Sequence, residues 1–308
     1  MTKYIITFIS TLAIFGFTTA QAETIKIGAA SPDGEYAQII VPAINSALLE
    51  YGYSAIAETS EGTQDDINKV ISGEIVAALT QLDVAALNMT PERDPNENLL
   101  LLWSRIAPKA LFCVAHKGGK VATYGDLTDE EHKSPLKISV GAEQGGTALT
   151  FQYLMKLDPK LQNIKFYNKG QTQVELNRLL SGRRDLVCFL AIPDPENEMI
   201  SGIMTHDELF FINIDNPAFD QAKIGTNRIY DVVEVPVTAG FLGFNQETVK
   251  TIITWVGMVT NENEIDEKLL NILSTVVMKS DLIPSNTIMA KTKRLFDKAM
   301  NRVDDWMN

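Results

Sequence analysis

Short apolar runs alternate with amphipathic runs over the first two thirds of the chain. The apolar runs have the length of strands, whereas the amphipathic runs carry apolar residues at helical spacing. Expected strands cover 24–29, 54–59, 74–81, 110–117, 137–141, 163–168 and 185–192, and expected helices cover 35–50, 64–72, 148–157 and 173–181. Strands that alternate with helices predict an α/β fold with a mostly parallel sheet covered on both faces.

The same order of elements occurs twice. Residues 71–75 (ISGEI) precede one expected buried strand, and residues 180–185 (LSGRRD) precede another at the matching place. Glycine suits the left-handed conformation that often ends a helix. This recurrence predicts two similar lobes. The last third is less regular, with apolar runs at 209–214 and 252–260 and an expected amphipathic helix at 286–306.

Two local signals concern the first helices. Pro42 lies inside the expected helix 35–50, where proline would kink the interior. Thr63 and Asp66 have the spacing of a capping box at the start of the next helix.

Three glycine-containing turns, at 31–36, 60–63 and 141–147, follow expected strands and precede expected helices. The last, GAEQGGT, has neither the lysine of a phosphate-binding loop nor the spacing of a dinucleotide fingerprint. Each turn offers free backbone N–H groups at the positive end of a helix dipole, which suits a small anion. The alternative is that the turns are only helix caps. The candidate hydroxyl partners of the anion are Ser31, Ser60, Thr63 and Thr147.

Helix N-termini alone do not account for tight binding. Each contributes about 0.3–1 kcal/mol, or about 2 kcal/mol when partly buried, whereas micromolar affinity requires about 8 kcal/mol. Side-chain contacts and closure of two facing lobes must supply the remainder. In the third turn we expect Thr147 to cap its helix, and Gly145 and Gly146 to allow close backbone approach.

The N-terminal segment has the pattern of a secretory signal peptide. Lys3 precedes a nearly continuous apolar run, and Ala20 and Ala22 form an A-x-A site, so we expect cleavage before Glu23 and a periplasmic location. An uncleaved membrane anchor is the alternative, although the run is short for a span. Loss of Lys3 changes the formal charge from −12 to −13, which argues against nucleic acid or anionic lipid as a partner.

Sequence patterns for catalysis or metal binding are absent. There is neither a G-x-S-x-G elbow nor an H-E-x-x-H zinc helix, and no cysteine–histidine cluster has metal-ligand spacing. Arg183 and Arg184 have the chemistry to clamp a carboxylate, but their helix-to-strand connection favours exposure to solvent. The histidines, which are scattered, are His116, His132 and His206.

The two cysteines, Cys113 and Cys188, each lie in an apolar run. An oxidising compartment would permit a disulfide. We nevertheless expect buried free thiols, because the two runs fall in different halves of the chain and a buried cysteine behaves as a small hydrophobe.

Several short motifs follow one another in a fixed order. They are AASPDGEY at 29–36, TSEGT at 59–63, SGE at 72–74 with QLDVA at 81–85, YGDL at 124–127, SVGAEQGGT at 139–147, and Pro193. This order resembles the TAXI family of TRAP-transporter solute receptors, and the resemblance covers residues 24–195. It implies the two-lobed type II periplasmic-binding fold, in which each lobe is a mostly parallel sheet flanked by helices and the ligand cleft lies between the lobes.

The turns depart from the family pattern where Pro32, Glu61, Glu143 and Gln144 replace small residues. The resemblance implies carboxylate ligands such as glutamate, glutamine and 2-oxo acids, yet the two glutamates bring negative charge to the turns. They either point away from the ligand or indicate a ligand that bears an amine.

The resemblance implies a receptor that captures a small carboxylate, an amino acid or a 2-oxo or dicarboxylic acid, and delivers it to the permease subunits of a TRAP transporter. A binding protein for an ABC importer or a sensor kinase is the alternative, and a secreted hydrolase is the alternative from another class. We expect no enzymatic activity, no cofactor or metal, and a monomer. The expected ligand-binding residues are Ser31, Gly34, Tyr36, Ser60, Gly62, Thr63, Gln81, Gln144, Gly145, Gly146, Thr147 and Pro193.

The expected organisation has four segments. A signal peptide at 1–22 precedes a first lobe at 23–115 and a second lobe at 116–235, and residues 236–308 return to the first lobe and end in helices.

Overall fold

The computed structural model describes residues 22–89, 99–129, 134–168, 171–239 and 246–283. Residues 1–21 of the expected signal peptide at 1–22 and the expected C-terminal helix at 286–306 lie outside these ranges. In the part of the chain that is described, no helix has both the length and the apolar character needed to span a membrane.

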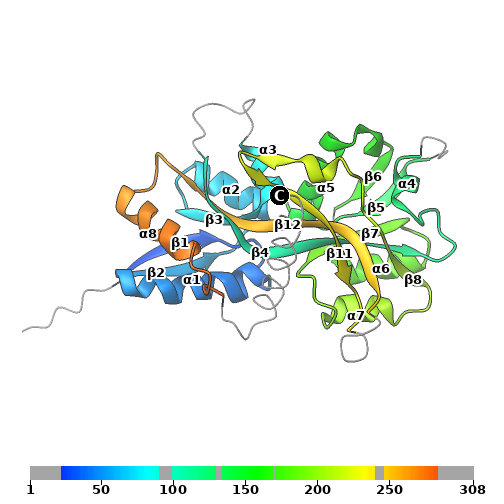
Figure 1. Ribbon diagram of the computed structural model, residues 1–308, viewed down its shortest axis with the longest axis horizontal. Coiled ribbons are helices and arrows are strands. Elements are labelled where there is room, and N and C mark those ends of the chain that lie inside the picture. The colour runs from blue at the N-terminus through cyan, green and yellow to red at the C-terminus, as the bar shows by residue number, and fades with distance from the viewer. Residues whose placement is uncertain (1–21, 90–98, 130–133, 169–170, 240–245, 284–308) are drawn as a thin grey trace, which may run out of the picture.

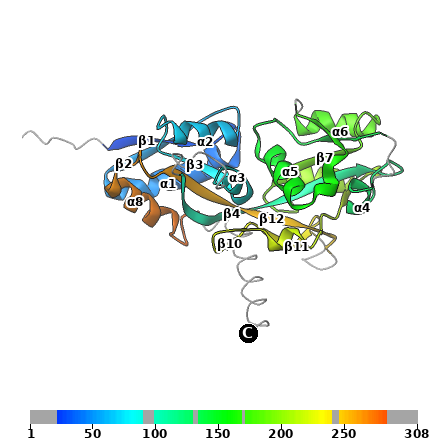
Figure 2. The ribbon, with the colours of Figure 1, turned by 90° about the horizontal axis from the view of Figure 1, so that it is seen from above.

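Two lobes are joined by two long strands that run from one lobe into the other (Figures 1 and 2). The strands of the first lobe are β1 (Glu23–Gly28), β2 (Tyr53–Glu58) and β3 (Ala77–Gln81). Those of the second are β5 (Leu136–Ser139), β6 (Ile164–Tyr167), β7 (Leu186–Ala191) and β8 (Leu209–Ile212). The joining strands are β4 (Leu99–His116) and β12 (Thr248–Asn261), and β11 (Tyr230–Pro236) pairs with β12.

Helices flank the sheet in both lobes. The first lobe has a π-helical turn at Tyr36–Ile40 and helices α1 (Val41–Leu48), α2 (Thr63–Ile71), α3 (Leu82–Asn88) and α8 (Glu267–Val277). The second has α4 (Tyr124–Leu127), α5 (Gly146–Leu157), α6 (Thr172–Leu180) and α7 (Glu198–Met204). Short elements complete the described chain: 3-10 turns at Leu49–Tyr51, Pro159–Gln162 and Phe219–Gln221, and the pair β9 (Lys223–Ile224) and β10 (Asn227–Arg228).

The strand order is β2-β1-β3-β12-β4-β7-β5-β6, with parallel pairing within each group of three outer strands and antiparallel pairing around β4 and β12. Successive residues of β3 face opposite sides: Leu79 packs in the cluster formed with α1 and α8, and Ala78 packs in the cluster formed with α2 and α3. The prediction of a two-lobed α/β fold with mostly parallel sheets is confirmed.

Helix ends follow from local chemistry. Gly73 and Gly182 are left-handed, with φ of 74° and 70°, and both close Schellman motifs in which the next residue donates to the carbonyl of Lys69 or Arg178. Pro42 causes no break, because a π-helical turn ends at Ile40 and proline falls in the first turn of α1, where its missing N–H costs no helical bond.

The predicted capping box at Thr63 and Asp66 is wrong. The N-cap of α2 is Gly62 and not Thr63, so the cap has no side chain that could bond to the helix. Asp66 instead accepts a hydrogen bond from the backbone N–H of Ala30. A capping box does form at α4, between Thr123 and Asp126.

The prediction of free thiols is also wrong, because Cys113 and Cys188 form a disulfide. The run 110–117 was assigned to the first half of the chain, whereas β4 begins at Leu99 and extends into the second lobe, where Cys113 lies directly opposite Cys188 of β7. The antiparallel register places their Cα atoms 4.1 Å apart.

Only one of the two adjacent arginines is exposed, so the sequence interpretation is wrong for Arg184. Arg183 faces solvent, but Arg184 is 9% exposed, and its Nε donates to Glu175 Oε2 at 2.6 Å. The guanidinium also lies 3.7 Å from the centre of the Tyr167 ring. Arg184 therefore belongs to the interior of the second lobe and not to a ligand clamp.

Candidate ligand-binding site between the lobes

The second and third glycine turns, which belong to different lobes, touch each other. The backbone N–H of Gln64 donates to the carbonyl of Gln144 at 3.2 Å. A Cβ at Gly62 would lie 2.4 Å from that same carbonyl oxygen, and Gly62 has a φ of +155°. Glycine is therefore required at 62 both by its backbone conformation and by the approach of the opposite turn.

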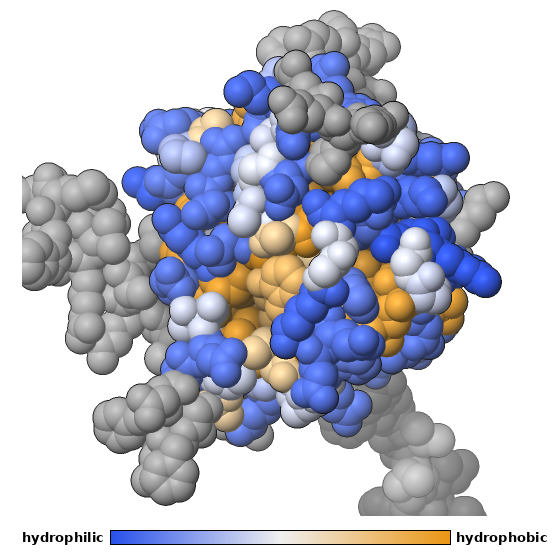
Figure 3. Space-filling view, turned by 90° about the vertical axis from the view of Figure 1, so that its right-hand side faces the viewer, coloured by the Kyte–Doolittle hydropathy of each residue, from blue (hydrophilic) through white to orange (hydrophobic). Residues whose placement is uncertain are grey.

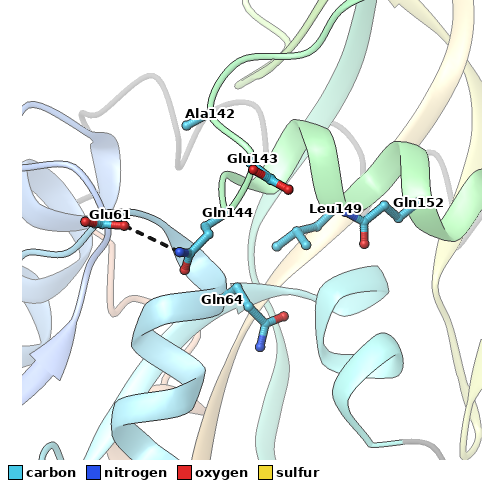
Figure 4. Close-up of a pocket in the computed structure, with 7 residues that line it drawn as sticks. All are labelled: Glu61, Gln64, Ala142, Glu143, Gln144, Leu149 and Gln152. Atoms are coloured by element: carbon cyan, nitrogen blue, oxygen red, sulfur yellow. Dashed lines mark hydrogen bonds between the residues drawn. The ribbon is translucent and has the colours of Figure 1, made fainter. Parts of the chain in front are cut away.

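A cavity of about 780 Å³ opens beside this contact (Figure 4). The Nε2 of Gln144 donates to Glu61 Oε2 at 3.4 Å and so links the two lobes across the cavity edge. The lining residues include two carboxylates, three side-chain amides and no basic group. They are Glu61, Gln64, Ala142, Glu143, Gln144, Leu149 and Gln152.

Asp66 connects the first and second turns through hydrogen bonds. The backbone N–H of Ser60 donates to the Ala30 carbonyl at 2.9 Å, and the N–H of Ala30 donates to Asp66 Oδ2 at 2.8 Å. Burial raises the pKa of Asp66 from 3.8 to about 6, against the opposing effects of the Ser60 hydroxyl and the Ala30 N–H. The Ser60 hydroxyl also donates to the carbonyl of Gly62, which stiffens the second turn.

The start of α5 lies against a side chain from the other lobe. A Cβ at Gly146 would meet the Gln81 side chain at 2.1 Å, so glycine permits the approach of Gln81 to this helix N-terminus. Gln81 is 4% exposed, and its Oε1 has no hydrogen-bond partner among the described residues. The two predicted residues are therefore neighbours across the boundary between the lobes.

Thr147 does not cap α5, contrary to the sequence prediction. Gly145 is the N-cap, and the Thr147 Oγ1 accepts a hydrogen bond from the backbone N–H of Leu190 at 3.2 Å. This contact leaves the hydroxyl hydrogen available to a ligand.

The first turn contributes one buried aromatic residue. Tyr36 is 5% exposed, and its hydroxyl has no hydrogen-bond partner among the described residues. Burial, together with nearby Glu35, Asp83 and Asp66, raises the pKa of this phenol well above its usual value. By contrast, Ser31 is exposed at the rim of the turn, where its carbonyl accepts from the N–H of Gly34 at 3.0 Å.

The remaining predicted residues occupy supporting positions. Thr63 is 2% exposed at the start of α2. Pro193 is buried and follows Ile192, whose side chain packs in the apolar cluster of the first lobe. The end of β7 thus also reaches the boundary between the lobes.

Sequence reasoning missed Asp83, which is fully buried at the start of α3. Its Oδ2 accepts hydrogen bonds from the Thr150 hydroxyl of α5 and, at 2.8 Å, from the Tyr230 hydroxyl of β11. Desolvation raises the pKa of Asp83, and the two hydroxyls and the Val84 N–H lower it. An aspartate directly after a buried strand was the available signal, but its partners lie far away in the sequence.

Smaller cavities lie in the second lobe, away from the glycine turns. One of about 330 Å³ includes Lys117, Met204 and Phe211, one of about 270 Å³ includes Arg184, and one of about 220 Å³ lies between α6 and α7. Figure 3 views the molecule from this end and shows hydrophobic residues at the surface among polar ones. Among the described residues, no group of histidine, cysteine and carboxylate side chains forms a metal site.

The fold is similar to solved structures of ligand-binding proteins. A Xanthomonas citri protein bound to ATP matches with a TM-score of 0.55 and 8% identity, over 88% of this chain and 88% of that chain. The AvGluR1 ligand-binding domain in complex with serine matches with a TM-score of 0.50 and 15% identity, over 89% and 95%. A Salmonella typhimurium periplasmic binding protein with high arginine specificity has a TM-score of 0.49 and 12% identity, over 89% and 98%.

No protein-family model and no curated protein sequence match the chain. At these identities the structural likeness establishes the fold alone, which is the two-lobed α/β fold of ligand-binding domains.

Proposed function

We propose that this protein is an extracytoplasmic solute receptor that captures a small carboxylate between its lobes. The observation that carries the proposal is the meeting of two glycine turns, one from each lobe, beside a cavity of about 780 Å³. Ligands of α/β sheets bind at the carboxyl ends of strands, and both turns follow such ends. A solute held there favours the closed arrangement because it contacts both lobes.

The finer proposal is a receptor of a TAXI-type TRAP transporter, which hands an amino acid or a 2-oxo or dicarboxylic acid to membrane permease subunits. It is supported by the order of motifs in the sequence. A binding protein for an ABC importer is the alternative, because the two-lobed fold by itself does not identify the membrane partner. The export signal, the lobe boundaries at 115 and 235, and the monomeric state remain part of this proposal.

The function is tested first on the purified wild type. Native mass spectrometry should detect a co-purified solute, and L-serine, L-glutamate, L-arginine, pyruvate and 2-oxoglutarate should be screened by thermal shift. At least one carboxylate should raise the melting temperature without being consumed, because a ligand that binds only the folded state stabilises it. Turnover of a probe would instead support the hydrolase alternative.

Thr147→Val then tests the predicted site. Loss of a hydrogen bond to a charged ligand group costs about 1.5–3 kcal/mol, so affinity should fall roughly 10- to 150-fold in calorimetric titration. Thr205→Val is the matched control, since the Thr205 hydroxyl donates to its own helix at the carbonyl of Gly202. Equal affinities for both variants would place the solute elsewhere.

A further inference from the structure

Lys109 lies where the first turn meets the joining strands. Its side chain is 14% exposed, and its Nζ is 2.8 Å from Glu35 Oε2. The same ammonium lies 4.9 Å from the centre of the Tyr36 ring. The next residue on β4, Ala110, pairs with Ala191 at the end of β7. Lys109 therefore stands between two elements that carry predicted ligand residues.

The surroundings of this lysine are rich in negative charge. Glu35 pairs with it, and Asp66 and Asp83 are close enough to the neighbouring Tyr36 to raise the pKa of its phenol. Glu61 and Glu143 add negative charge at the cavity beside the second and third turns. A small carboxylate entering such a region is repelled unless a cation compensates its charge. Backbone N–H groups at the helix ends supply only partial charges. The proposed ligand class thus requires a basic side chain at the boundary between the lobes.

Several buried atoms of these residues lack hydrogen-bond partners among the described residues, including the Tyr36 hydroxyl and Gln81 Oε1, which can bond to a carboxylate and to an amine. Gln81 pairs across the sheet with Val256, which also pairs with Ala107, two residues before Lys109. Tyr36 packs in the apolar cluster that contains Ala107 and Val256. Buried polar atoms are normally hydrogen-bonded, so the two point to a polar molecule that completes them.

We propose that Lys109 is the counter-ion of the solute carboxylate and exchanges Glu35 for the solute on binding. The inference rests on the proposed function. It extends that function by naming the ammonium of Lys109 as the positive charge that makes the site prefer an acid. The Tyr36 hydroxyl donates to the same carboxylate, and Gln81 Oε1 accepts from a donor on the solute, such as an amine. Glu35 has a side chain that is 28% exposed, so its Oε2, which is buried in this structure, turns towards water when Lys109 leaves it.

The exchange suits lysine. Its ammonium sits at the end of a flexible four-carbon chain and turns between partners with little change in the backbone. The Tyr36 ring attracts the ammonium of Lys109 whether its partner is Glu35 or the solute. The ammonium therefore keeps a favourable contact during the exchange.

The test compares the two partners of one ion pair. Lys109→Met should weaken binding of the carboxylate that stabilises the wild type, drawn from L-serine, L-glutamate, L-arginine, pyruvate and 2-oxoglutarate, by about 10- to 150-fold. Glu35→Gln should bind it at least as tightly as the wild type, because a competitor for Lys109 is removed. Lys26→Met is the control, since Lys26 pairs with Glu58 on the first lobe at 3.2 Å.

A second measurement separates charge recognition from general damage. The wild type should prefer the acid over its carboxamide, for example L-serine over L-serinamide, and Lys109→Met should lose this preference. Should Lys109→Met not fold, Lys109→Gln takes its place. Equal losses in Lys109→Met and Glu35→Gln, or an unchanged acid preference, would show a structural ion pair and overturn the inference. A wild type that binds no probe would instead overturn the proposed function.

Discussion

Two of the contacts between the lobes have opposite character. Helices α3 and α5 meet in the interior, where Asp83, Thr150 and Tyr230 are all at most 1% exposed and hydrogen-bonded. Leu149 of α5 and Val84 of α3 also belong to one apolar cluster. The glycine turns meet near the surface, through one backbone bond and a side-chain bond of 3.4 Å between Gln144 and Glu61.

This difference predicts which contact holds the lobes together and which one breaks when the lobes separate. Breaking the helix contact would leave two buried hydroxyls without their acceptor and the Asp83 carboxylate with the Val84 N–H but neither hydroxyl as a donor, which is costly in a dry interior. Breaking the turn contact exposes groups that water satisfies at once. The helix contact therefore acts as the fixed side of the boundary, and the turn contact as its entrance.

The largest effect is expected from removing the anchor. Asp83→Ala leaves the hydroxyls of Thr150 and Tyr230 without their acceptor, at about 1–3 kcal/mol each, so urea unfolding should show a loss of about 2–6 kcal/mol. Asp65→Ala is the control, because Asp65 forms a helical surface pair with Lys69, worth about 0–1 kcal/mol. Similar stabilities of the two variants would remove the distinction between anchor and entrance.

The next effect concerns closure and not stability. Gly62→Ala places a methyl group against the Gln144 carbonyl, so the lobes should remain apart and solute affinity should fall by about tenfold or more. Gly52→Ala is the matched control, because Gly52 also has a positive φ but open space around its Cβ position. Small-angle scattering with solute should give a larger radius of gyration for Gly62→Ala only. Equal radii would contradict the turn contact as an entrance.

A pH effect of intermediate size is expected from Asp66, which supports the turns. Its folded-state pKa of about 6 lies above the usual 3.8, so the folded chain holds the proton more tightly than the unfolded chain. This group therefore makes stability fall as pH rises from about 4 to about 6. Asp66→Asn should remove that part of the slope in melting temperature, whereas Asp65→Asn should not. A slope unchanged in Asp66→Asn would assign it to other buried carboxyls.

The smallest effect belongs to the side-chain bond at the entrance. Gln144→Ala removes a long and exposed hydrogen bond to Glu61, so calorimetry should show an affinity loss of about two- to fivefold, equivalent to about 0.5–1 kcal/mol. Gln152→Ala lines the same cavity without that bond and serves as the control. A loss as large as that of Gly62→Ala would mean that Gln144 holds the solute itself.

Local chemistry was readable from the sequence. Apolar periodicity located β1, β2, β5 and β7 to within a residue or two, because strand and helix spacing depend on neighbours along the chain. The glycines at 73 and 182 marked helix ends for the same reason. The alternation of these elements was enough to predict an α/β fold with two lobes.

The candidate site was readable only in part. The sequence placed Gly62, Gln81, Gln144 and Gly146 in one site. The fold brings Gly62 against Gln144 and Gly146 against Gln81, although their binding of a solute remains a prediction. It gave no sign that Gly62 meets Gln144 or that Thr147 bonds to Leu190 in place of capping α5.

Long-range pairing was decided by tertiary structure. The register of β4 against β7 brought Cys113 opposite Cys188, and the packing of α3 on α5 brought Thr150 to Asp83 over 67 residues. In the sequence, Lys109 is a lysine within an apolar segment, and only the path of β4 brings it next to Tyr36. The periodicity of a segment shows which of its side chains are buried. It does not show which distant residue each of them contacts, because the packing of the whole chain decides that.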